Sequence, residues 1–546
     1  MRAGATRLRG ALPALLGLVL AAAIGQTTAP VPGFGQPRTG GDAAMAIFGA
    51  PGSVLLPAFT STNFSITVAQ TGNRSLISYS PNLRMQPDMA ESWTISPDGR
   101  TYTFTLRPGL RWSDGAPITS QDFQYTALAL SSSRTTSNWF QWVAEVQGAA
   151  VRKAGKSDAL PGFKVVSDRV FQVTTETPSA SFLDLFGTEL MPLPAHSLRS
   201  IPLPELQKSD FARVPKVSSG PFAITDYQTD SLVTMARNPY YYGRRPALDR
   251  IYIKVLTPET AVAQLERGEL QVIPGEISGE LPPTDVALLS RNPDLAVTSY
   301  PNTNTEVLYI NVKRKPLDDV RVRQAMAYAI NREAIVASAL LGMAKVAYAP
   351  YASFTPWYDK SLNPYKFDPA HAKQILAEAR YDSSAPIRFL VPTGDTTVIN
   401  VGTVIAQELR TAGLNIAIEQ TDFATAVNRL IVAHDFDLSI TQNRGFNDPD
   451  LSRRFSTAAI SNGGVNAGQY SNPTLDQLLD QARHTVDAKQ QLPILYKIQE
   501  IVTTDVPVIL LYYRDSIGAV NTKQLGGAVP RFGGVFRDAA NWYRKP

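Results

Sequence analysis

Cysteine is absent from this chain of 546 residues. Its absence excludes a disulfide scaffold, a cysteine nucleophile, thiolate metal ligands and a lipid anchor on an N-terminal cysteine. The fold must therefore be stabilised by buried apolar surface, and a chain of this length with 44% hydrophobic residues has enough of it. The length indicates two or three domains.

Histidine is nearly as scarce, and the four residues lie far apart in the chain: His196, His371, His434 and His484. They form no metal-binding motif, so neither a metal nor another cofactor is expected. The chain also lacks the Gly-x-Ser-x-Gly and His-Glu-x-x-His motifs of common hydrolases. These absences predict a protein that is not an enzyme.

Long apolar runs are confined to the N-terminus. Three arginines precede an apolar run over residues 11–24, and small residues follow it. This pattern is typical of a secretory signal peptide, expected over residues 1–29, and the Pro-, Gly- and Ala-rich residues 30–45 are expected to form a flexible leader. No later run reaches the about 18 apolar residues of a membrane span. The sequence therefore predicts secretion without a transmembrane anchor.

Charge of one sign is not in large excess. The chain has 52 basic and 47 acidic residues, and three of the arginines lie in the expected signal peptide, which leaves 49 basic residues. A nucleic-acid-binding protein needs a basic face, which this balance does not support. No nucleic-acid partner is expected.

The stretch 305–342 predicts a strand followed by two helices. Its first eight residues suit a strand that is buried on both faces. Pro316 ends the strand, Asp318 is placed to cap the first helix, and Asn331 is placed to cap the second. We expect the chain to pass here from a first lobe to a second, with a ligand cleft between the two.

Other segments predict further strands and helices. Apolar strands flank a turn at Pro97-Asp98-Gly99, and Thr119 with Asp122 forms a capping box that begins a helix. The first strand is expected at Ala46–Phe48, and strands that alternate with helices predict a mostly parallel sheet in the first lobe. We assign the last apolar strand, Val508–Tyr513, to the return into the first lobe.

Two segments carry a family resemblance. The run Leu308-Tyr-Ile-Asn311 and the residues 316–335 that follow resemble the signature of family 5 of the extracytoplasmic solute-binding proteins. The hairpin and helix start over 87–123 resemble another characteristic segment of this family, and the resemblance spans residues 45–520. The family contains the peptide- and nickel-type receptors of ABC importers.

The resemblance implies an α/β fold of two lobes. This is the periplasmic-binding-protein fold of type II, cluster C-like, with a small extra α+β subdomain in the first lobe. Lobe I is expected over 46–75, 206–300 and 506–546, the extra subdomain over 76–205, and lobe II over 301–505.

The resemblance also implies a function. The chain is expected to be the periplasmic substrate-binding component of an ABC importer, a monomer that captures a small solute between its lobes. The solute is expected to be a peptide, a peptide-like compound or an anionic conjugate, delivered to the transmembrane subunits of an ABC permease. Without a cysteine to carry lipid, the protein is expected to be free in the periplasm. Two alternatives stay open: a secreted hydrolase with an unusual carboxylate pair, and a receptor used for sensing or as a chaperone and not for uptake.

The candidate ligand site follows a strand at 437–442, because ligands of open α/β sheets bind beyond the carboxyl ends of strands. In peptide receptors of the resembling family, an aspartate shortly before an Asp-Pro pair binds the ammonium group of the substrate. Here the pair is Asp448-Pro449, but the matching position falls on Arg444 or Gly445. Arg444 would favour a carboxylate or phosphate in the cleft; alternatively it is a solvated residue that pairs with a nearby aspartate.

The expected ligand-binding residues lie in four places. They are Thr441, Gln442, Asn443, Arg444, Phe446, Asn447 and Asp448 in the segment just described, Asn304 and Thr305 before the crossover strand, Ser53 in the loop after the first strand, and Trp139 as an apolar wall. Besides Arg444, four of these have a structural alternative. Asn304 and Thr305 suit a plain turn, Asp448 suits a residue that caps or orders the loop, and Trp139 suits a core position.

Overall fold

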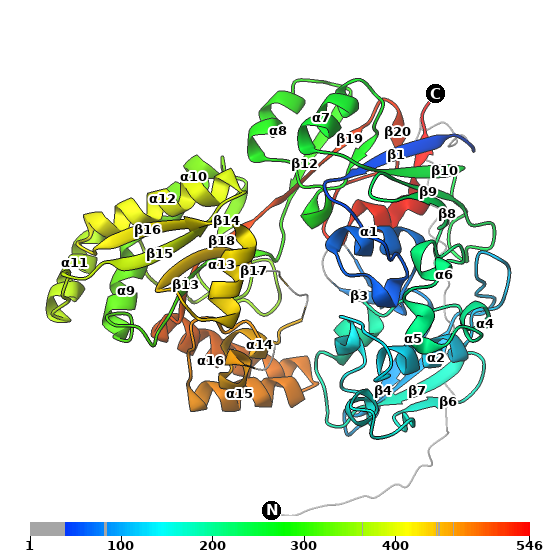
Figure 1. Ribbon diagram of the computed structural model, residues 1–546, viewed down its shortest axis with the longest axis horizontal. Coiled ribbons are helices and arrows are strands. Elements are labelled where there is room, and N and C mark those ends of the chain that lie inside the picture. The colour runs from blue at the N-terminus through cyan, green and yellow to red at the C-terminus, as the bar shows by residue number, and fades with distance from the viewer. Residues whose placement is uncertain (1–38, 81–83, 363, 444, 446–447, 462–463) are drawn as a thin grey trace, which may run out of the picture. The chain divides into compact units, whose positions relative to one another are not determined.

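The computed structural model describes residues 39–546 apart from 81–83, 363, 444, 446–447 and 462–463. The expected signal peptide and three expected site residues, Arg444, Phe446 and Asn447, lie outside the described residues. The described chain contains a seven-stranded, a six-stranded and a four-stranded sheet, and two pairs of short strands (Figure 1).

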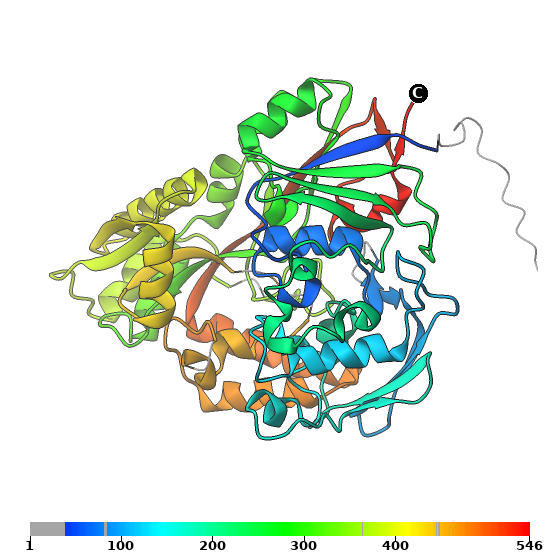
Figure 2. The ribbon, with the colours of Figure 1, turned by 45° about the vertical axis from the view of Figure 1, so that its right-hand side comes forward.

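The seven-stranded sheet has the order β12-β19-β11-β1-β10-β9-β8. Its strands are β1 (Asp42–Ile47), β8 (Phe222–Gln228), β9 (Leu232–Arg237), β10 (Arg250–Val255), β11 (Val272–Ile273), β12 (Leu295–Tyr300) and β19 (Ser516–Asn521). β1 is parallel to β10 and β11, and the other neighbours are antiparallel; β8, β9 and β10 lie side by side in Figure 2. The prediction of a mostly parallel sheet is therefore wrong, because the chain turns back after β8 and after β9 without a helical crossover.

β1 begins at Asp42, before the expected start of the first strand. The end of the expected leader, 30–45, therefore belongs to a core strand, in which Ala43 and Met45 are fully buried. The sequence did not show this because alanine and aspartate are weak strand formers. Alternate residues of β1 point into two cores, one with α1 (Asn63–Gly72) and one with α7 (Pro258–Glu266) and α8 (Pro283–Leu289).

The six-stranded sheet has the order β14-β18-β13-β17-β15-β16. Its strands are β13 (Thr305–Ile310), β14 (Ala344–Val346), β15 (Ile387–Pro392), β16 (Ile416–Thr421), β17 (Leu438–Asn443) and β18 (Val508–Arg514). Every residue of β13 is buried, which confirms a strand covered on both faces. One face packs on α9 (Val320–Ala329), α10 (Arg332–Ala339) and α12 (Thr396–Thr411), and the other on α13 (Phe423–Val427) and η5 (Asn428–Val432).

Two segments join the seven-stranded and six-stranded sheets: residues 301–304 lead from β12 to β13, and Asp515 leads from β18 to β19. The assignment of Val508–Tyr513 to the first lobe is wrong, because β18 pairs with β13 and β14. The return is made by β19 instead. An apolar strand suits either sheet, since its own periodicity does not encode its pairing partner.

The predicted helix starts are confirmed with one shift. Asn331 caps α10 through the N–H of Ala334 at 2.9 Å. Asp319, and not Asp318, caps α9 through the N–H of Arg321 at 2.9 Å. Asp318 is part of the preceding turn, in which its N–H donates to the carbonyl of Arg314 at 3.0 Å.

The four-stranded sheet consists of β4 (Ala90–Ile95), β5 (Thr101–Leu106), β6 (Phe163–Val165) and β7 (Val170–Thr174). β4 and β5 form the predicted hairpin. The predicted capping box is confirmed at the start of α2 (Ser120–Leu130), where Asp122 accepts the N–H of Thr119 at 2.8 Å. A further core lies among α14 (Ser452–Phe455), α15 (Pro473–His484) and α16 (Ala488–Asp505).

Candidate functional site

A cavity of about 460 Å³, called here the solute cavity, lies at the carboxyl end of β17. One wall comes from residues 141–185, and the other comes from the six-stranded sheet and the helices beside it. The first wall contains Gln141, Ala144, Glu145, Ser181 and Leu185. The second contains Tyr309, Phe423, Val427, Leu430, Ile431, Thr441, Gln442, Asn443, Asp448, Asp450, Ser452, Arg453, Arg454, Val465 and Arg483.

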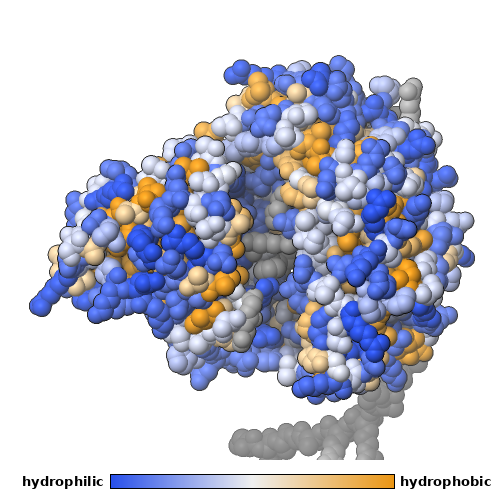
Figure 3. Space-filling view, in the orientation of Figure 1, coloured by the Kyte–Doolittle hydropathy of each residue, from blue (hydrophilic) through white to orange (hydrophobic). Residues whose placement is uncertain are grey.

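An apolar surface on α13 and η5 forms part of the second wall. It consists of Phe423, Val427, Leu430 and Ile431. Phe423 is 60% exposed, and hydrophobic side chains gather over α13 in Figure 3. Phe423 and Val427 remain open to solvent while Leu430 is buried beneath them, and adjoining exposed apolar side chains are typical of a binding surface.

Charged side chains line the rest of the solute cavity, three of each sign: Glu145, Asp448, Asp450, Arg453, Arg454 and Arg483. Arg483 lies with Nη2 3.7 Å from Oε1 of Glu145 and with Nε 3.5 Å from Oδ2 of Asp450. Its carbonyl oxygen accepts the N–H of Ala180 at 2.9 Å. Arg483 therefore connects the two walls.

Asp448 has a strongly perturbed carboxyl group. Burial, with the charge of Asp450 adding to it, raises the pKa of Asp448 to about 7. The N–H of Asp450, which donates to this carboxylate at 3.2 Å, acts in the opposite direction but is outweighed. The side chain opens onto the cavity and is only partly covered. A carboxyl group that titrates near neutral pH is typical of binding and catalytic sites.

Asn443 is held in a fixed orientation at the end of β17. The hydroxyl of Tyr309 donates to its Oδ1 at 2.5 Å, and both residues line the solute cavity. In the pairing of β13 with β17, Asn443 lies opposite Thr305 and Tyr309 lies opposite Ser439, so both side chains project from the same face of the sheet. One amide of the site is thus oriented before any ligand enters.

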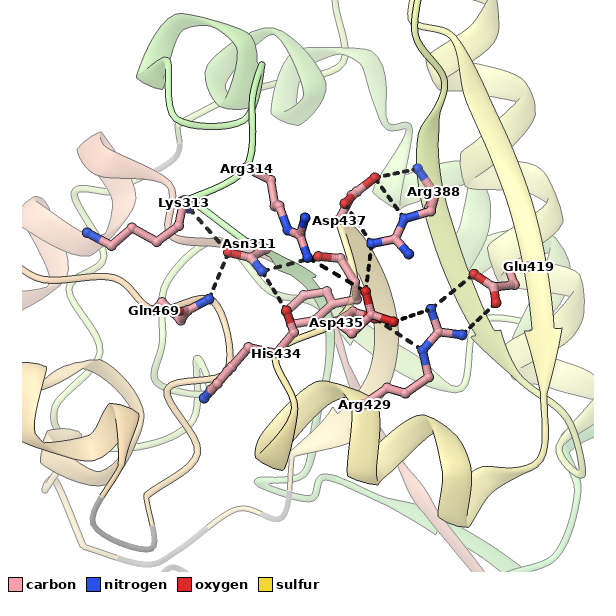
Figure 4. Close-up of polar contacts among 11 residues, drawn as sticks. Asn311, Lys313, Arg314, Arg388, Glu419, Arg429, His434, Asp435, Asp437 and Gln469 are labelled. Carbon is pink, nitrogen blue, oxygen red and sulfur yellow. Dashed lines mark hydrogen bonds and ion pairs between the residues drawn. The ribbon is translucent and has the colours of Figure 1, made fainter.

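The other end of β17 is anchored by an ion-pair network (Figure 4). Asp435 lies 3.0 Å from Arg388 and 3.4 Å from Arg429, and Asp437 lies 3.3 Å from Arg388. Arg429 also pairs with Glu419 at 2.5 Å. The hydrogen bond from Arg388 lowers the pKa of Asp435, so this carboxylate stays ionised. The network joins β15, η5 and β17 and so fixes the strand that carries the site.

The structure places the predicted site residues in different surroundings. Thr441, Gln442, Asn443 and Asp448 line the solute cavity. Asn304 and Thr305 are buried and do not line it; Asn304 instead accepts the N–H of Gly445 at 2.8 Å. Arg444, Phe446 and Asn447 lie outside the described residues.

Two predicted residues lie away from the solute cavity. The indole N–H of Trp139 donates to the carbonyl of Thr60 at 2.8 Å, and its ring stacks on Trp142 with centroids 4.9 Å apart. This is the core position that the sequence left open for Trp139. Ser53 is exposed and is not among the residues that line the cavity.

Sequence reasoning missed the apolar surface on α13 and η5, and it missed Glu145 and Arg483. Phe423, Val427 and Leu430 recur at helical spacing, which is also the pattern of an ordinary core-facing helix. No local signal distinguishes the two. Glu145 and Arg483 are far apart in sequence and meet only through the tertiary fold.

Within the described part of the chain, no group of three or more His, Asp or Glu side chains is arranged to hold a metal ion. A search of the same residues for a helix both long and apolar enough to span a membrane gave none.

Comparisons with known proteins agree on one family. The model of the bacterial extracellular solute-binding proteins, family 5 (middle region), matches residues 84–464. A putative ABC transporter peptide-binding protein of Brucella abortus is 30% identical over 409 residues, which cover 72% of each chain. The dipeptide-binding protein of Escherichia coli is 26% identical over 463 residues, covering 82% of this chain and 84% of its own. The crystal structure of the ABC transporter substrate-binding protein CtaP of Listeria monocytogenes, 23% identical, superposes with a TM-score of 0.83 over 93% of this chain and all of the other.

Proposed function

Because this chain belongs to family 5 of the bacterial extracellular solute-binding proteins, it is the extracytoplasmic substrate-binding component of an ABC importer, and we propose that it captures its solute in the cavity at the end of β17. The family resemblance and the two-lobed α/β fold expected from the sequence are confirmed. Family 5 consists of solute-binding proteins and not of enzymes.

One observation carries the proposal: the solute cavity has walls from both halves of the chain. A ligand that contacts both walls binds more tightly when they are close together, so it shifts the population towards the closed form. The volume of about 460 Å³ suits a small molecule. Capture and release by such closure needs no covalent chemistry in this chain.

The solute proposed for this cavity is peptide-like. Its apolar part would lie against Phe423 and Val427, and its ammonium group near Asp448 and Asp450. These aspartates supply the carboxylates that the segment 440–446 lacks. Arg444 stays a proposed partner for a carboxylate or phosphate group of the same solute. The peptide-binding relatives support this class of solute.

The remaining parts of the functional assignment are proposals of the same kind. The protein would be a free periplasmic monomer that docks on the transmembrane subunits of its permease. Deleting the gene and measuring uptake of the identified solute separates import from a sensing or chaperone role, because only import loses uptake.

Mass spectrometry of the native protein after denaturation is expected to release an amphipathic, peptide-like solute. Calorimetry with that solute then tests the site. Phe423→Ser is expected to weaken binding about tenfold or more, since removing a buried aromatic contact costs roughly 1.5–3 kcal/mol. Val432→Ser is the control, because Val432 at the end of η5 is 70% exposed and does not line the cavity.

Equal affinities for both variants and the unmodified protein would remove the apolar surface from the site. Recovery of the solute unchanged after prolonged incubation is expected as well. A hydrolysed solute would instead favour the hydrolase alternative.

A further inference from the structure

A second cavity, of about 250 Å³ and called here the arginine cavity, lies between the end of α1, the hairpin of β2 (Ile77–Tyr79) and β3 (Met85–Pro87), and residues 531–541. It shares no lining residue with the solute cavity. Its lining is dominated by polar and charged side chains, whereas a large part of the solute cavity is apolar. The arginine cavity therefore suits a different kind of ligand.

Arg74 forms a rigid base for this cavity. It is 7% exposed, and its guanidinium donates to the carbonyl oxygens of Gln70 and Asn73, both at 3.1 Å, and of Arg537 at 2.6 Å. A weaker contact reaches the hydroxyl of Tyr241 at 3.4 Å. None of these partners is a carboxylate, so the positive charge of Arg74 is oriented but not neutralised by direct contact.

Three more arginines line the arginine cavity: Arg244, Arg531 and Arg537. Arg531 is paired with Asp538 at 2.6 Å. Nε of Arg537 is buried and has no hydrogen-bond partner among the described residues. A buried N–H that lacks an acceptor costs free energy, and a bound oxygen atom would remove that cost.

The carboxylates of the arginine cavity do not balance its arginines. Asp538 already forms an ion pair with Arg531, and Asp88 accepts a hydrogen bond from the hydroxyl of Tyr242. Among the described residues, Asp88 and Glu189 are the remaining carboxylates of the lining, whereas three of its arginines, Arg74, Arg244 and Arg537, have no directly bonded carboxylate. One positive charge is in excess, in a site where a planar donor group is already fixed.

We propose that the arginine cavity is a second ligand site, which binds a small oxyanion through Arg74, Arg537 and Arg244. The ligand is a free phosphate or a small carboxylate; both present oxygen acceptors to guanidinium groups with the same geometry. The volume is below that of common ligand sites, which excludes a peptide of several residues. This site does not depend on the identity of the imported solute.

Calorimetric titration of the full mature protein with inorganic phosphate and with citrate, against sodium chloride at matched ionic strength, tests this proposal. Binding of either anion, but not of chloride, is expected. Arg537→Gln and Arg244→Gln are each expected to weaken binding about tenfold, the effect of losing a charge-assisted hydrogen bond. Arg245→Gln removes the same charge from an exposed neighbour outside the cavity and is expected to leave affinity unchanged.

Circular dichroism and the melting temperature establish that each variant is folded, and the exposed Arg244 keeps the test valid if Arg537→Gln does not fold. Asp448→Asn, in the solute cavity, is expected to retain full oxyanion affinity. Binding of phosphate alone or of citrate alone identifies the oxyanion class. The proposal is overturned if phosphate and citrate both give the same heat of titration as sodium chloride. It is also overturned if Arg245→Gln loses as much anion affinity as Arg537→Gln and Arg244→Gln.

Discussion

At the scale of single residues, the most informative feature of this protein is two carboxyl groups whose pKa is raised. Asp448 opens onto the solute cavity, whereas Glu306 in β13 is 1% exposed and its Oε1 has no hydrogen-bond partner among the described residues. Burial raises the pKa of both to about 7. The same physical cause therefore has two results, a titratable contact for the solute in one case and a pH-dependent stability in the other.

Affinity for a solute with an ammonium group is expected to rise several-fold between about pH 6 and pH 7.5, because ionised Asp448 attracts the ammonium and protonated Asp448 does not. Asp448→Asn should remove this dependence and bind weakly throughout. Calorimetry across the pH range makes the measurement. If the affinity of Asp448→Asn still rises with pH, the titrating group is a different one.

Stability is expected to depend on pH through Glu306. Its folded-state pKa of about 7 lies above the usual value of 4.5, so the folded state holds a proton that the unfolded state loses. Glu306 therefore contributes most to the free energy of unfolding below about pH 4.5. This contribution falls by on the order of 2–3 kcal/mol as the pH rises to about 7. Arg514 partly offsets the effect, while Asp395 and Glu280 add to it.

Glu306→Gln is expected to remove this pH dependence of the free energy of unfolding. It is also expected to raise the denaturation midpoint at pH 8 relative to the unmodified protein. Chemical denaturation at pH 5 and pH 8 measures it. The exposed Glu500→Gln on α16 is a matched control that should change neither value. A midpoint at pH 8 that falls in Glu306→Gln would mean that the ionised carboxylate stabilises the fold.

At the scale of elements, β17 positions the site because it is fixed at both ends. Asp435 and Asp437 pair with arginines before the strand, and the N–H of Gly445 donates to Asn304 after it. The strand itself lies between β13 and β15. The residues at its carboxyl end therefore have little freedom, and Gly445 is held against the crossover 301–304.

Gly445→Ala is expected to weaken solute binding and to lower the melting temperature. A Cβ on Gly445 would lie 2.1 Å from Oγ1 and 2.3 Å from the backbone carbonyl of Thr303, so the loop or the crossover must move. A cost of roughly 1–3 kcal/mol is typical of such overpacking. Thermal denaturation and calorimetry measure the two effects, and wild-type values for both would show that the loop tolerates a side chain.

At the scale of the whole molecule, contacts between distant segments complete the solute cavity. Arg483 joins Glu145 to Asp450, and near the crossovers Arg514 lies 3.2 Å from Glu280 and 3.4 Å from Asp395. Of these contacts, Arg483–Glu145 spans the two walls, and Arg514–Glu280 joins segments on either side of the crossovers, so these two depend on how closely the parts approach. They are therefore suited to control how long a captured solute stays bound.

Arg483→Gln is expected to accelerate solute dissociation about three- to tenfold and to slow association little, because it removes a partly buried ion pair between the walls. Lys497→Gln, on an exposed position of α16, removes the same charge as a control. Stopped-flow measurements with the identified solute give both rates. Equal dissociation rates for the two variants would separate Arg483 from closure.

The sequence by itself determined the family and most of the local structure. Local patterns can be recognised from the sequence because they depend on neighbours a few residues away. Examples are the hairpin, the capping box of Thr119 and Asp122, and the strand 305–310. Thr441–Asn443 and Asp448 became candidates because they lie at or beyond the carboxyl end of a predicted strand, and the structure brings them to one cavity.

Only the tertiary structure decided which strands pair and which side chains meet. β18 joined β13, against expectation, because strand pairing is a contact between distant segments that its own alternation does not encode. Phe423 lines the solute cavity and Trp139 packs against a core, partly buried, although both are aromatic, because burial depends on what packs opposite. The charged end of the site, Glu145, Asp450 and Arg483, exists only where three remote segments fold together.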